Sequence, residues 1–480
     1  MSPFRFPALT TTFVLLFAIS QAQTSAPFTG AWAGTVVGIK LIFHFTVSAT
    51  GQPQGTLDSP QQGDFDHPFD AVVVHSDSLI CVLKTPAARY EAIRTGDSTC
   101  WGTWYQGGNS FPLTMHRLTA TETQALVKPG RPQTPKPPFP YHSDSVEYDN
   151  ADKTVHLAAT LTYPDKGGPF PAAILITGSG IQDRDETLFG HHPFAVIADY
   201  LTRQGYAVLR VDDRTAGLST GDVHSATSAD FAKDVETSFS WLKTRKGIDP
   251  KKIGLIGHSE GAIIAPMVAA ENKDVAFIIS LAGPLNGYST LMYQILTPLE
   301  RSHANEQVIA FQLAKERMLL KNIKNAADSA GFMQGMDSDY RAYYASIPDS
   351  LRPQYNFVPK PDLYLHALAP LAHSTIAPWW KFLVGYQADT YYSKVDCPVL
   401  LLGGDKDFQV PNATDMTVIT SILKNHHNTK VETHLMPGLN HLFQHCHTCL
   451  LQEYGQLEET FSPEVLSIMA SWLDKTFPSR

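Results

Sequence analysis

From residue 154 onward, short apolar segments alternate with longer segments whose apolar residues recur at helical spacing. Continuously apolar segments are typical of strands buried on both faces, and the helices between them cover those faces. The alternation predicts a mostly parallel, doubly wound α/β sheet. The expected strands are Thr154–Tyr163, Ala172–Thr177, Tyr206–Val211, Lys252–Gly257, Val275–Ala282, Pro398–Gly403 and Thr429–Met436, and the clearest helices are Pro193–Arg203, Ser228–Lys246, Ser259–Ala270 and Pro463–Lys475.

One interval interrupts this alternation. More than a hundred residues separate the strand that ends at Ala282 from the strand that begins at Pro398. The interval holds a helical stretch, Asn305–Lys324, and an aromatic group around Trp379 and Trp380. Structureless loops of this length are rare in compact domains, so we expect a helical cap inserted into the sheet at about residues 285–392.

The region before the α/β segment has a different pattern. Between Gly30 and Arg117, short strand-like runs are separated every 8 to 12 residues or so by Gly, Asp, Gln and Pro clusters. This spacing predicts a small all-β domain over residues 27–120, an antiparallel sandwich or barrel. Residues 121–142 follow as a linker, because Lys128–Tyr141 reads KPGRPQTPKPPFPY and is too rich in proline for a helix or central strand. The α/β domain is then expected over residues 143–480.

The first 22 residues have the features of a secretory signal peptide. Arg5 precedes the apolar run Phe13–Ile19, and Ser20 to Ala22 provide small residues for cleavage. The apolar run is too short to span a bilayer, so we expect an exported protein, periplasmic or secreted, with no membrane span after cleavage. The formal net charge is −9, from 37 basic and 46 acidic residues. Such a balance argues against binding nucleic acid.

The chain has five cysteines, so at least one is unpaired within the chain. Cys81 and Cys100 lie in separate strand-like segments, where a bridge or two buried thiols are equally compatible with the sequence. Cys446 and Cys449 form a C-x-x-C motif with no second pair of metal ligands after it. A local disulfide is therefore favoured there over a metal site, and Cys397 has no evident partner.

The motif Gly257-His258-Ser259-Glu260-Gly261 matches G-x-S-x-G between an expected strand and an expected helix. In this context the serine stands on a sharp turn as a nucleophile, and glycines are needed where side chains would not fit. The backbone N–H of Glu260 then points to the reaction centre as one donor of an oxyanion hole. The alternative is a serine that only caps its helix.

A serine nucleophile requires a histidine base and an acid that orients it, in the chain order Ser, acid, His. Asp407 is the preferred acid, because it lies deep in the loop after strand Pro398–Gly403, and Asp405 is the alternative. His441 follows strand Thr429–Met436 and is the preferred base. His445 and His447 lie further along and are interpreted as surface histidines.

The second oxyanion donor is expected in the loop Thr177–Glu186, which follows strand Ala172–Thr177. We assign it to the N–H of Ser179, with Gly180 as the alternative. The loop matches neither phosphate-binding glycine motif. Its charged residues Asp183, Arg184 and Asp185 are expected to form a supporting ion-pair network with the loop Asp212–Arg214.

Taken together, these motifs resemble exported bacterial α/β-hydrolases of the esterase and dienelactone hydrolase-like group, which are related to serine peptidases of the prolyl oligopeptidase type. The resemblance covers Val146 to Phe477, and implies Ser259, Asp407 and His441 as the triad. Two departures affect loop shape, namely Arg214-Thr215-Ala216-Gly217 in place of R-G-x-G, and Ala262 where a second glycine is common. The matching segments are LAATLTYP (157–164), TGSGIQDRDE (177–186), GHHPFAVIADYLTRQGYAVLRVDDR (190–214), IGHSEGAIIAP (256–266), GGDKDFQVP (403–411), PGLNHLFQ (437–444) and EETFSPEVL (458–466).

The resulting hypothesis is a carboxylesterase-type serine hydrolase that cleaves small esters, with short acyl chains, through an acyl-enzyme. A peptidase or aminopeptidase acting on small peptides is the alternative, and a non-catalytic binding protein is less favoured because the ordered triad is complete. No cofactor or metal is expected. The sequence leaves the natural substrate, the role of the all-β domain and the oligomeric state open.

Overall fold

The computed structural model describes residues 27–478 except 37, 85, 86, 108, 125, 127 and 356. The described chain forms two compact units. The first ends at Leu126 and excludes residues 60–65, which belong with the second unit from residue 127 onward. The predicted signal peptide, Met1–Ala22, lies outside the described residues.

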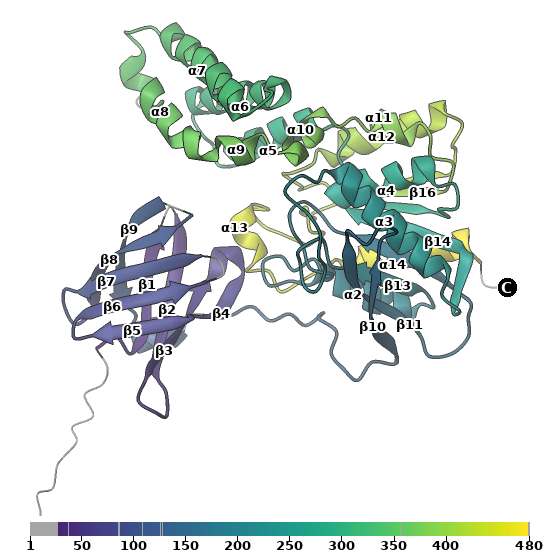
Figure 1. Cartoon of the computed structure of the whole chain (residues 1–480), viewed down its shortest axis with the longest axis horizontal. Helices are drawn as coiled ribbons and strands as arrows, with labels where there is room; N and C mark the ends of the chain where they lie inside the picture. Colours follow the sequence, from purple (N-terminus) through teal and green to yellow (C-terminus); the bar gives the residue numbers. More distant parts are fainter. Residues whose placement is uncertain are drawn as a thin grey trace, which may run out of the picture. The chain divides into compact units, whose positions relative to one another are not determined.

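The first unit is built on a nine-stranded sheet of order β4-β3-β2-β1-β9-β8-β7-β6-β5 (Figure 1). Consecutive strands from β5 to β9 and from β1 to β3 pair antiparallel, and β1 pairs with β9. Its core includes Trp32, Phe43, Tyr90 and Leu113, all fully buried. The strands are β1 (Gly30–Val36), β2 (Ile39–Val47), β3 (Pro53–Ser59), β4 (Asp64–Pro68), β5 (Ala71–His75), β6 (Ser78–Leu83), β7 (Ala88–Arg94), β8 (Thr99–Gln106) and β9 (Asn109–Arg117), followed by the short helix α1 (Ala120–Gln124). The short helix η1 (Pro60–Gln62) belongs with the second unit.

The second unit contains an eight-stranded sheet of order β10-β11-β13-β12-β14-β15-β16-β17. The pairs β10–β11 and β11–β13 are antiparallel, whereas all pairs from β13 to β17 are parallel. This order confirms the predicted α/β-hydrolase fold with a preceding all-β unit. The strands are β10 (Tyr141–Asp149), β11 (His156–Pro164), β12 (Phe170–Ile176), β13 (Ala207–Val211), β14 (Ile248–His258), β15 (Ile278–Leu281), β16 (Val399–Gly404) and β17 (Val431–Met436).

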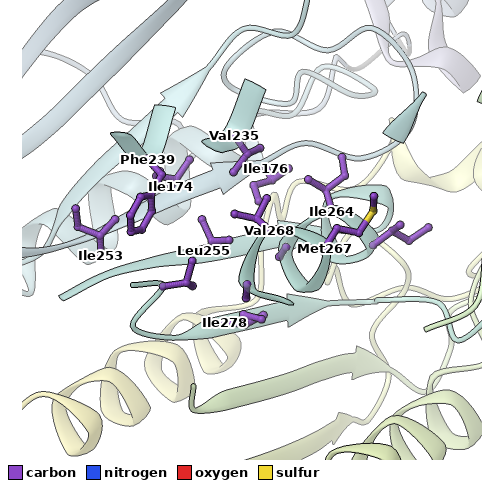
Figure 2. Packing of buried hydrophobic residues seen from close by; sticks show 14 of the residues in the cluster. Ile174, Ile176, Val235, Phe239, Ile253, Leu255, Ile264, Met267, Val268 and Ile278 are labelled. Atoms are coloured by element: carbon purple, nitrogen blue, oxygen red, sulfur yellow. The ribbon is translucent and has the colours of Figure 1, made fainter. Parts of the chain in front are cut away.

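Alternate residues of the central strands pack into two separate cores. In β12, Ile174 and Ile176 join the core beneath α3 and α4, while Leu175 joins the core beneath α2 and α14. Figure 2 shows Ile174 and Ile176 close to Val235 and Phe239 of α3. Because both faces are covered, these strands read as continuously apolar. The covering helices are α2 (Pro193–Arg203), α3 (Ser228–Lys243), α4 (Glu260–Glu271), α12 (Asn412–Asn425) and α14 (Pro463–Thr476).

Between β15 and β16 the chain is almost entirely helical, as expected for a cap. Two small cores hold the cap together, one around Phe332 and Met336 and the other around Phe311 and Tyr340. No helix in the described ranges is long and apolar enough to cross a membrane. The cap helices are α5 (Gly287–Arg301), α6 (Glu306–Asn325), α7 (Ser329–Ser346), η2 (Arg352–Tyr355), α8 (Pro361–Leu368), η3 (Ala369–Leu371), α9 (Ala372–Thr375), α10 (Pro378–Gly385) and α11 (Asp389–Tyr392), and α13 (Leu451–Tyr454) follows β17.

The proline-rich segment before β10 lies along the second unit and is held by side chains. Arg131 donates to the carbonyls of Gly190, Gly455 and Leu457 at 3.1, 2.7 and 2.8 Å. Gln133 accepts from the Thr460 amide at 2.5 Å. Hydrogen bonds to distant loops therefore fix the path of this segment. Proline has no backbone N–H, so a proline-rich segment cannot form a regular set of backbone hydrogen bonds of its own.

Candidate active site

Ser259 lies at the junction of β14 and α4, where the strand turns directly into the helix. Its backbone has φ +53° and ψ −111°, a strained conformation for a residue with a side chain. A Cβ atom on Gly257 would lie 2.0 Å from the carbonyl oxygen of Gly261, and one on Gly261 would lie 2.1 Å from that of Ile176. The two glycines of the motif therefore allow the close approach that presents Ser259.

Asp407 and His441 form a buried hydrogen-bonded pair. The Asp407 Oδ2 atom lies 2.7 Å from His441 Nδ1, and the two side chains are 0% and 5% exposed. Asp407 also accepts from the amides of Gln409 and Val410 at 2.7 and 3.0 Å, and from Asn412 Nδ2 at 2.9 Å. With this carboxylate accepting at Nδ1, the imidazole presents Nε2 as the atom free to take a proton.

Ser259 and His441 line the same cavity, of about 300 Å³. Ser179 of the loop after β12 also lines it, as the assignment of an oxyanion donor requires. The cavity thus brings together all four loops that carry the predicted site, since Gln409 of the acid loop also lines it, with Asp407 behind His441. Its lining consists of Gly178, Ser179, Gln182, Glu186, Leu188, Phe189, His258, Ser259, Leu291, Gln294, Trp379, Trp380, Leu383, Gln409, His441, Leu442, Leu451 and Tyr454.

The cap contributes aromatic and apolar walls to this cavity. Trp379 and Trp380 of α10 line it with their rings in an edge-to-face contact at 4.7 Å between centroids. The Trp379 indole N–H donates to Glu260 Oε1 at 2.8 Å. The sequence indicated an aromatic group in the insertion, but its place over the nucleophile depends on how the cap folds back.

Glu260 has a buried side chain as well as the amide expected at the oxyanion hole. Its carboxylate accepts from Ser228 Oγ at 2.6 Å and from Trp379, and Ser179 adds a side-chain hydrogen bond. Burial raises the pKa of Glu260, and these hydrogen bonds oppose the shift. Sequence reasoning missed this second role, although an acidic residue inside an otherwise apolar helix start was a visible signal.

The loop Thr177–Glu186 is held mainly by buried carboxylates. Asp213 accepts from Thr177 Oγ1 at 2.7 Å and from the Gln182 amide at 2.9 Å. Burial raises the pKa of Asp213 to about 8. Arg184 forms an ion pair with Asp212 at 2.6 Å, as the sequence predicted.

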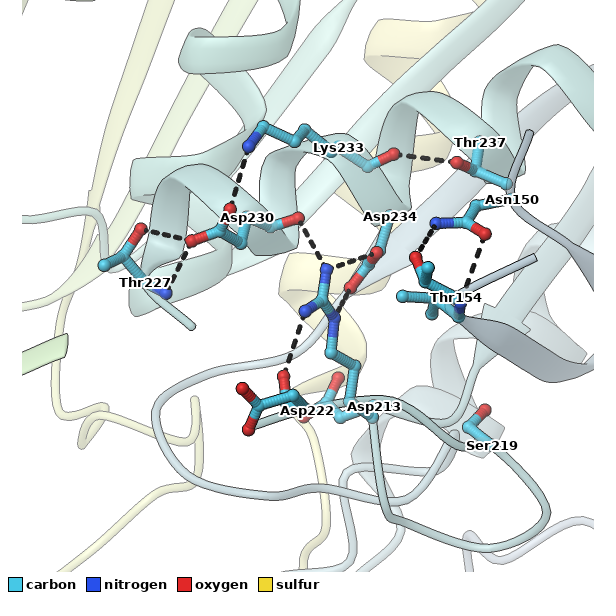
Figure 3. A network of polar contacts seen from close by, with 12 residues as sticks. Asn150, Thr154, Asp213, Ser219, Asp222, Thr227, Asp230, Lys233, Asp234 and Thr237 are labelled. Atoms are coloured by element: carbon cyan, nitrogen blue, oxygen red, sulfur yellow. Dashed lines mark hydrogen bonds and ion pairs between the residues drawn. The ribbon is translucent and has the colours of Figure 1, made fainter. Parts of the chain in front are cut away.

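Within the loop Asp212–Arg214, Arg214 has partners outside the predicted network. Its guanidinium binds Asp234 of α3 through contacts of 2.6 and 3.0 Å. Figure 3 shows Asp234 in the same network of α3 as Asp230 and Thr227. The left-handed backbone of Thr215, with φ +69°, follows directly after Arg214. Where the family pattern has R-G-x-G, this chain therefore has a loop that the Arg214–Asp234 contact holds against α3.

The alternative residues considered from the sequence occupy other positions. Asp405 accepts from the Gly438 amide at 2.7 Å. His445 is exposed and pairs with Glu459 at 2.8 Å. Neither contacts the Asp407–His441 pair.

Cys446 and Cys449 form a disulfide, whereas Cys81, Cys100 and Cys397 are free thiols. Cys81 and Cys100 are buried in the first unit and are not bridged to each other. The Cys100 thiol lies 3.7 Å from the Tyr90 hydroxyl.

Residues 152–438 match the family model described as X-Pro dipeptidyl-peptidase (S15 family). Among curated proteins, the chain is 34% identical over 150 residues to esterase EstD of Thermotoga maritima. It is 29% identical over 153 residues to an acyl transferase of Photobacterium phosphoreum. An esterase of Pyrococcus furiosus is similar in structure, with a TM-score of 0.42 and 18% identity, covering 70% of this chain and 91% of the esterase.

These sequence matches are partial. The EstD alignment covers 31% of this chain and 36% of EstD. The acyl transferase alignment covers 31% of this chain and 47% of the transferase. The chain therefore spans less than half the length of either curated relative.

Proposed function

Since the chain belongs to the S15 family, described as X-Pro dipeptidyl-peptidase, we propose that it is a serine hydrolase whose substrates are small, uncharged carboxylic esters. The catalytic residues of this proposal are Ser259, His441 and Asp407. The amides of Ser179 and Glu260 form the oxyanion hole. The observation that carries the choice of substrate is the composition of the cavity at Ser259.

In the proposed reaction, the Ser259 hydroxyl attacks the ester carbonyl carbon while His441 Nε2 takes the hydroxyl proton. The carbonyl oxygen becomes an oxyanion and accepts from the amides of Ser179 and Glu260. The C–O bond to the alcohol breaks, and His441 returns the proton to the leaving alcohol. Water then attacks the acyl-enzyme by the same steps, which releases the acid and restores Ser259.

The cavity walls support an uncharged substrate. Apart from His441 and His258, the described lining residues carry one ionisable side chain with a charge at neutral pH, Glu186, and this carboxylate is already bonded by His258 and the Gly178 amide. A peptidase that holds a peptide by its free ammonium group needs an available carboxylate. Apart from the hydroxyls of Ser179 and Ser259, the remaining lining is aromatic, aliphatic or amide, which favours a neutral acyl or alcohol group.

A panel of p-nitrophenyl acyl esters tests this proposal. We expect wild-type protein to hydrolyse the short-chain members, and Ser259→Ala to reduce the rate by about 10³-fold or more. Ser421→Ala, an exposed serine of α12 whose hydroxyl bonds within its own helix, is the matched control and should retain full activity. Ester turnover that survives Ser259→Ala would reject the proposed nucleophile.

A second candidate function is a peptidase that cleaves after proline, which the description of the matching family favours. Gly-Pro p-nitroanilide tests it in the same assay format. A kcat/KM for this anilide above that for p-nitrophenyl acetate would replace the ester proposal with the peptidase.

We also propose export, on the basis of the predicted signal peptide. Fractionation of expressing cells, with N-terminal sequencing of the mature protein, tests it. Recovery of uncleaved protein in the cytoplasm would contradict the proposal.

A further inference from the structure

Directly before the nucleophile, His258 carries a fully enclosed imidazole whose two ring nitrogens both have partners. Nδ1 lies 2.8 Å from Glu186 Oε1, and Nε2 lies 3.0 Å from the backbone carbonyl oxygen of His441. The His258 and Glu186 side chains are 5% and 1% exposed. Neither residue takes part in the proposed reaction steps, so the contacts need another explanation.

The partners determine where the protons lie. A backbone carbonyl can only accept, so His258 Nε2 must carry a hydrogen. Glu186 Oε1 also accepts from the Gly178 amide at 2.6 Å, which identifies this oxygen as an acceptor. If Glu186 is a carboxylate, His258 Nδ1 donates to the same oxygen. With a hydrogen on both nitrogens, the ring is an imidazolium and Glu186 is its carboxylate.

The surroundings are consistent with this charge state. Burial opposes a charged ring, but the charge of Glu186, its hydrogen bond and the His441 carbonyl outweigh burial, and the pKa of His258 is raised. The other groups that face the ring are Asp407, whose charge acts in the same direction, the His441 ring at 4.8 Å and the Phe443 ring at 6.5 Å. A neutral ring beside a Glu186 carboxylate would leave one of these hydrogen bonds unmade.

We infer that Glu186 and His258 are positioning residues, a buried ion pair that sets the oxyanion loop and the base loop against the nucleophile. Through Glu186 it fixes Gly178, the neighbour of the Ser179 donor. Through the His441 carbonyl it fixes the backbone of the base. The Glu186 backbone has φ +51°, a strained conformation that such a network can hold in place.

This inference rests on the proposed function only for the roles of Ser179 and His441, so the experiment needs no natural substrate. The rate at which a fluorophosphonate modifies Ser259 depends on the positions of the nucleophile, the base and the oxyanion donors together. Ester turnover in the same proteins gives kcat and KM. If wild-type protein is phosphonylated but cleaves no ester, the ester proposal is rejected. The positioning inference is then tested by the phosphonylation rates alone.

The decisive variant is Glu186→Gln, which keeps an oxygen acceptor for Gly178 and removes the charge. We expect phosphonylation and kcat to fall by about 10-fold to 100-fold, with KM within about two-fold, because misplaced donors weaken transition-state binding. The matched control is Glu432→Gln, which removes the carboxylate from a partly exposed pair with His434 at 2.7 Å and should change neither rate.

A measurement on wild-type protein guards against a variant that fails to fold. In protein labelled with ¹⁵N-histidine, we expect His258 to show protons on both ring nitrogens at pH 8, where an ordinary histidine is neutral. Glu186→Gln should remove one of them. A single ring proton in wild-type protein, or unchanged rates in folded Glu186→Gln, would overturn the inference.

Discussion

Two aspartates that are two residues apart in one loop have different surroundings in this protein. Asp407 is buried and accepts from two backbone amides and from Asn412, as well as contacting His441. Asp405 is partly exposed and bonds the Gly438 amide. At the scale of single residues, it is this enclosure by donors that makes Asp407 suited to hold an imidazole in one tautomer.

We predict that Asp407→Asn lowers kcat for p-nitrophenyl acetate by about 10³-fold to 10⁴-fold, with a small change in KM. The amide can donate to Nδ1, which favours the wrong tautomer of His441. Steady-state kinetics measure the effect, and near-UV circular dichroism verifies the fold. Asp405→Asn is the matched control, for which we expect a loss below ten-fold. Equal losses in both variants would contradict the assignment.

At the scale of elements, the junction of β14 and α4 is a tightly packed turn of the site. The atoms nearest to Gly257 and Gly261 belong to the backbone. A larger residue at either position therefore could not be accommodated by the movement of a neighbouring side chain. A methyl group there must displace β12 or the first turn of α4. Packing of the elements and presentation of Ser259 are therefore coupled.

We predict that Gly261→Ala destabilises the protein by at least about 2 kcal/mol, because the added Cβ would lie 2.1 Å from the Ile176 carbonyl oxygen. Urea unfolding followed by fluorescence measures the difference. Gly247→Ala, where a Cβ meets nothing within 4 Å, is the control and should change the stability by less than about 0.5 kcal/mol. A Gly261→Ala variant as stable as this control would contradict the steric argument.

The cap acts at the same scale, through helix α10. Trp379 both lines the cavity and donates to Glu260 beside the nucleophile. The position of the cap wall is therefore linked to the residue that follows Ser259.

We predict that Trp379→Ala enlarges the acyl side of the cavity and raises the ratio of kcat/KM for p-nitrophenyl octanoate over acetate by about three-fold to ten-fold. Trp379→Phe keeps an aromatic ring but loses the donor to Glu260, and should shift the ratio less. Trp101→Ala, on the exposed surface of the first unit, is the control. An unchanged ratio in Trp379→Ala would show that the indole does not limit acyl length.

At the scale of the whole molecule, buried polar contacts connect segments far apart in the chain. His191, two residues before α2, is fully buried. Its ring contacts Thr460 Oγ1 at 3.0 Å and the Tyr454 carbonyl at 2.9 Å, more than 260 residues later. Such contacts hold the C-terminal segment, which includes α13 of the cavity wall, against the loop before α2.

Burial lowers the pKa of His191 to about 4, from an ordinary value of 6.5. The unfolded chain therefore binds a proton that the folded protein excludes between these values, and stability is lost as the pH falls from about 6.5 towards 4. We predict a loss of about 2 to 3 kcal/mol from this group between pH 7.5 and pH 4.5.

Urea unfolding of wild-type protein and of His191→Asn at both pH values measures this contribution. The variant cannot be protonated, so its stability should fall less on acidification. His303→Asn replaces a histidine that is exposed on the cap and should behave as wild type. The same pH dependence in all three proteins would contradict the prediction.

Local patterns were sufficient to predict the architecture. Continuously apolar strands and the helices between them indicated the doubly wound sheet, and the long interval before Pro398 indicated the cap. Strand β10 was missed, because its polar sequence YHSDSVEYD is mostly exposed at the edge of the sheet and carries no core pattern. The order Ser259, Asp407, His441 was evident from which strand each residue follows.

The sequence by itself determined the class of fold and the loops that carry the proposed chemistry, because strand periodicity, helix periodicity and glycine-dependent turns are local properties. Only the tertiary structure decided which side chains meet. The choice of Asp407 over Asp405 as the partner of His441, the Trp379–Glu260 contact and the Glu186–His258 pair each depend on residues from different elements. Such partners are chosen by how the sheet and the cap pack, and the spacing of residues along the chain does not contain that information.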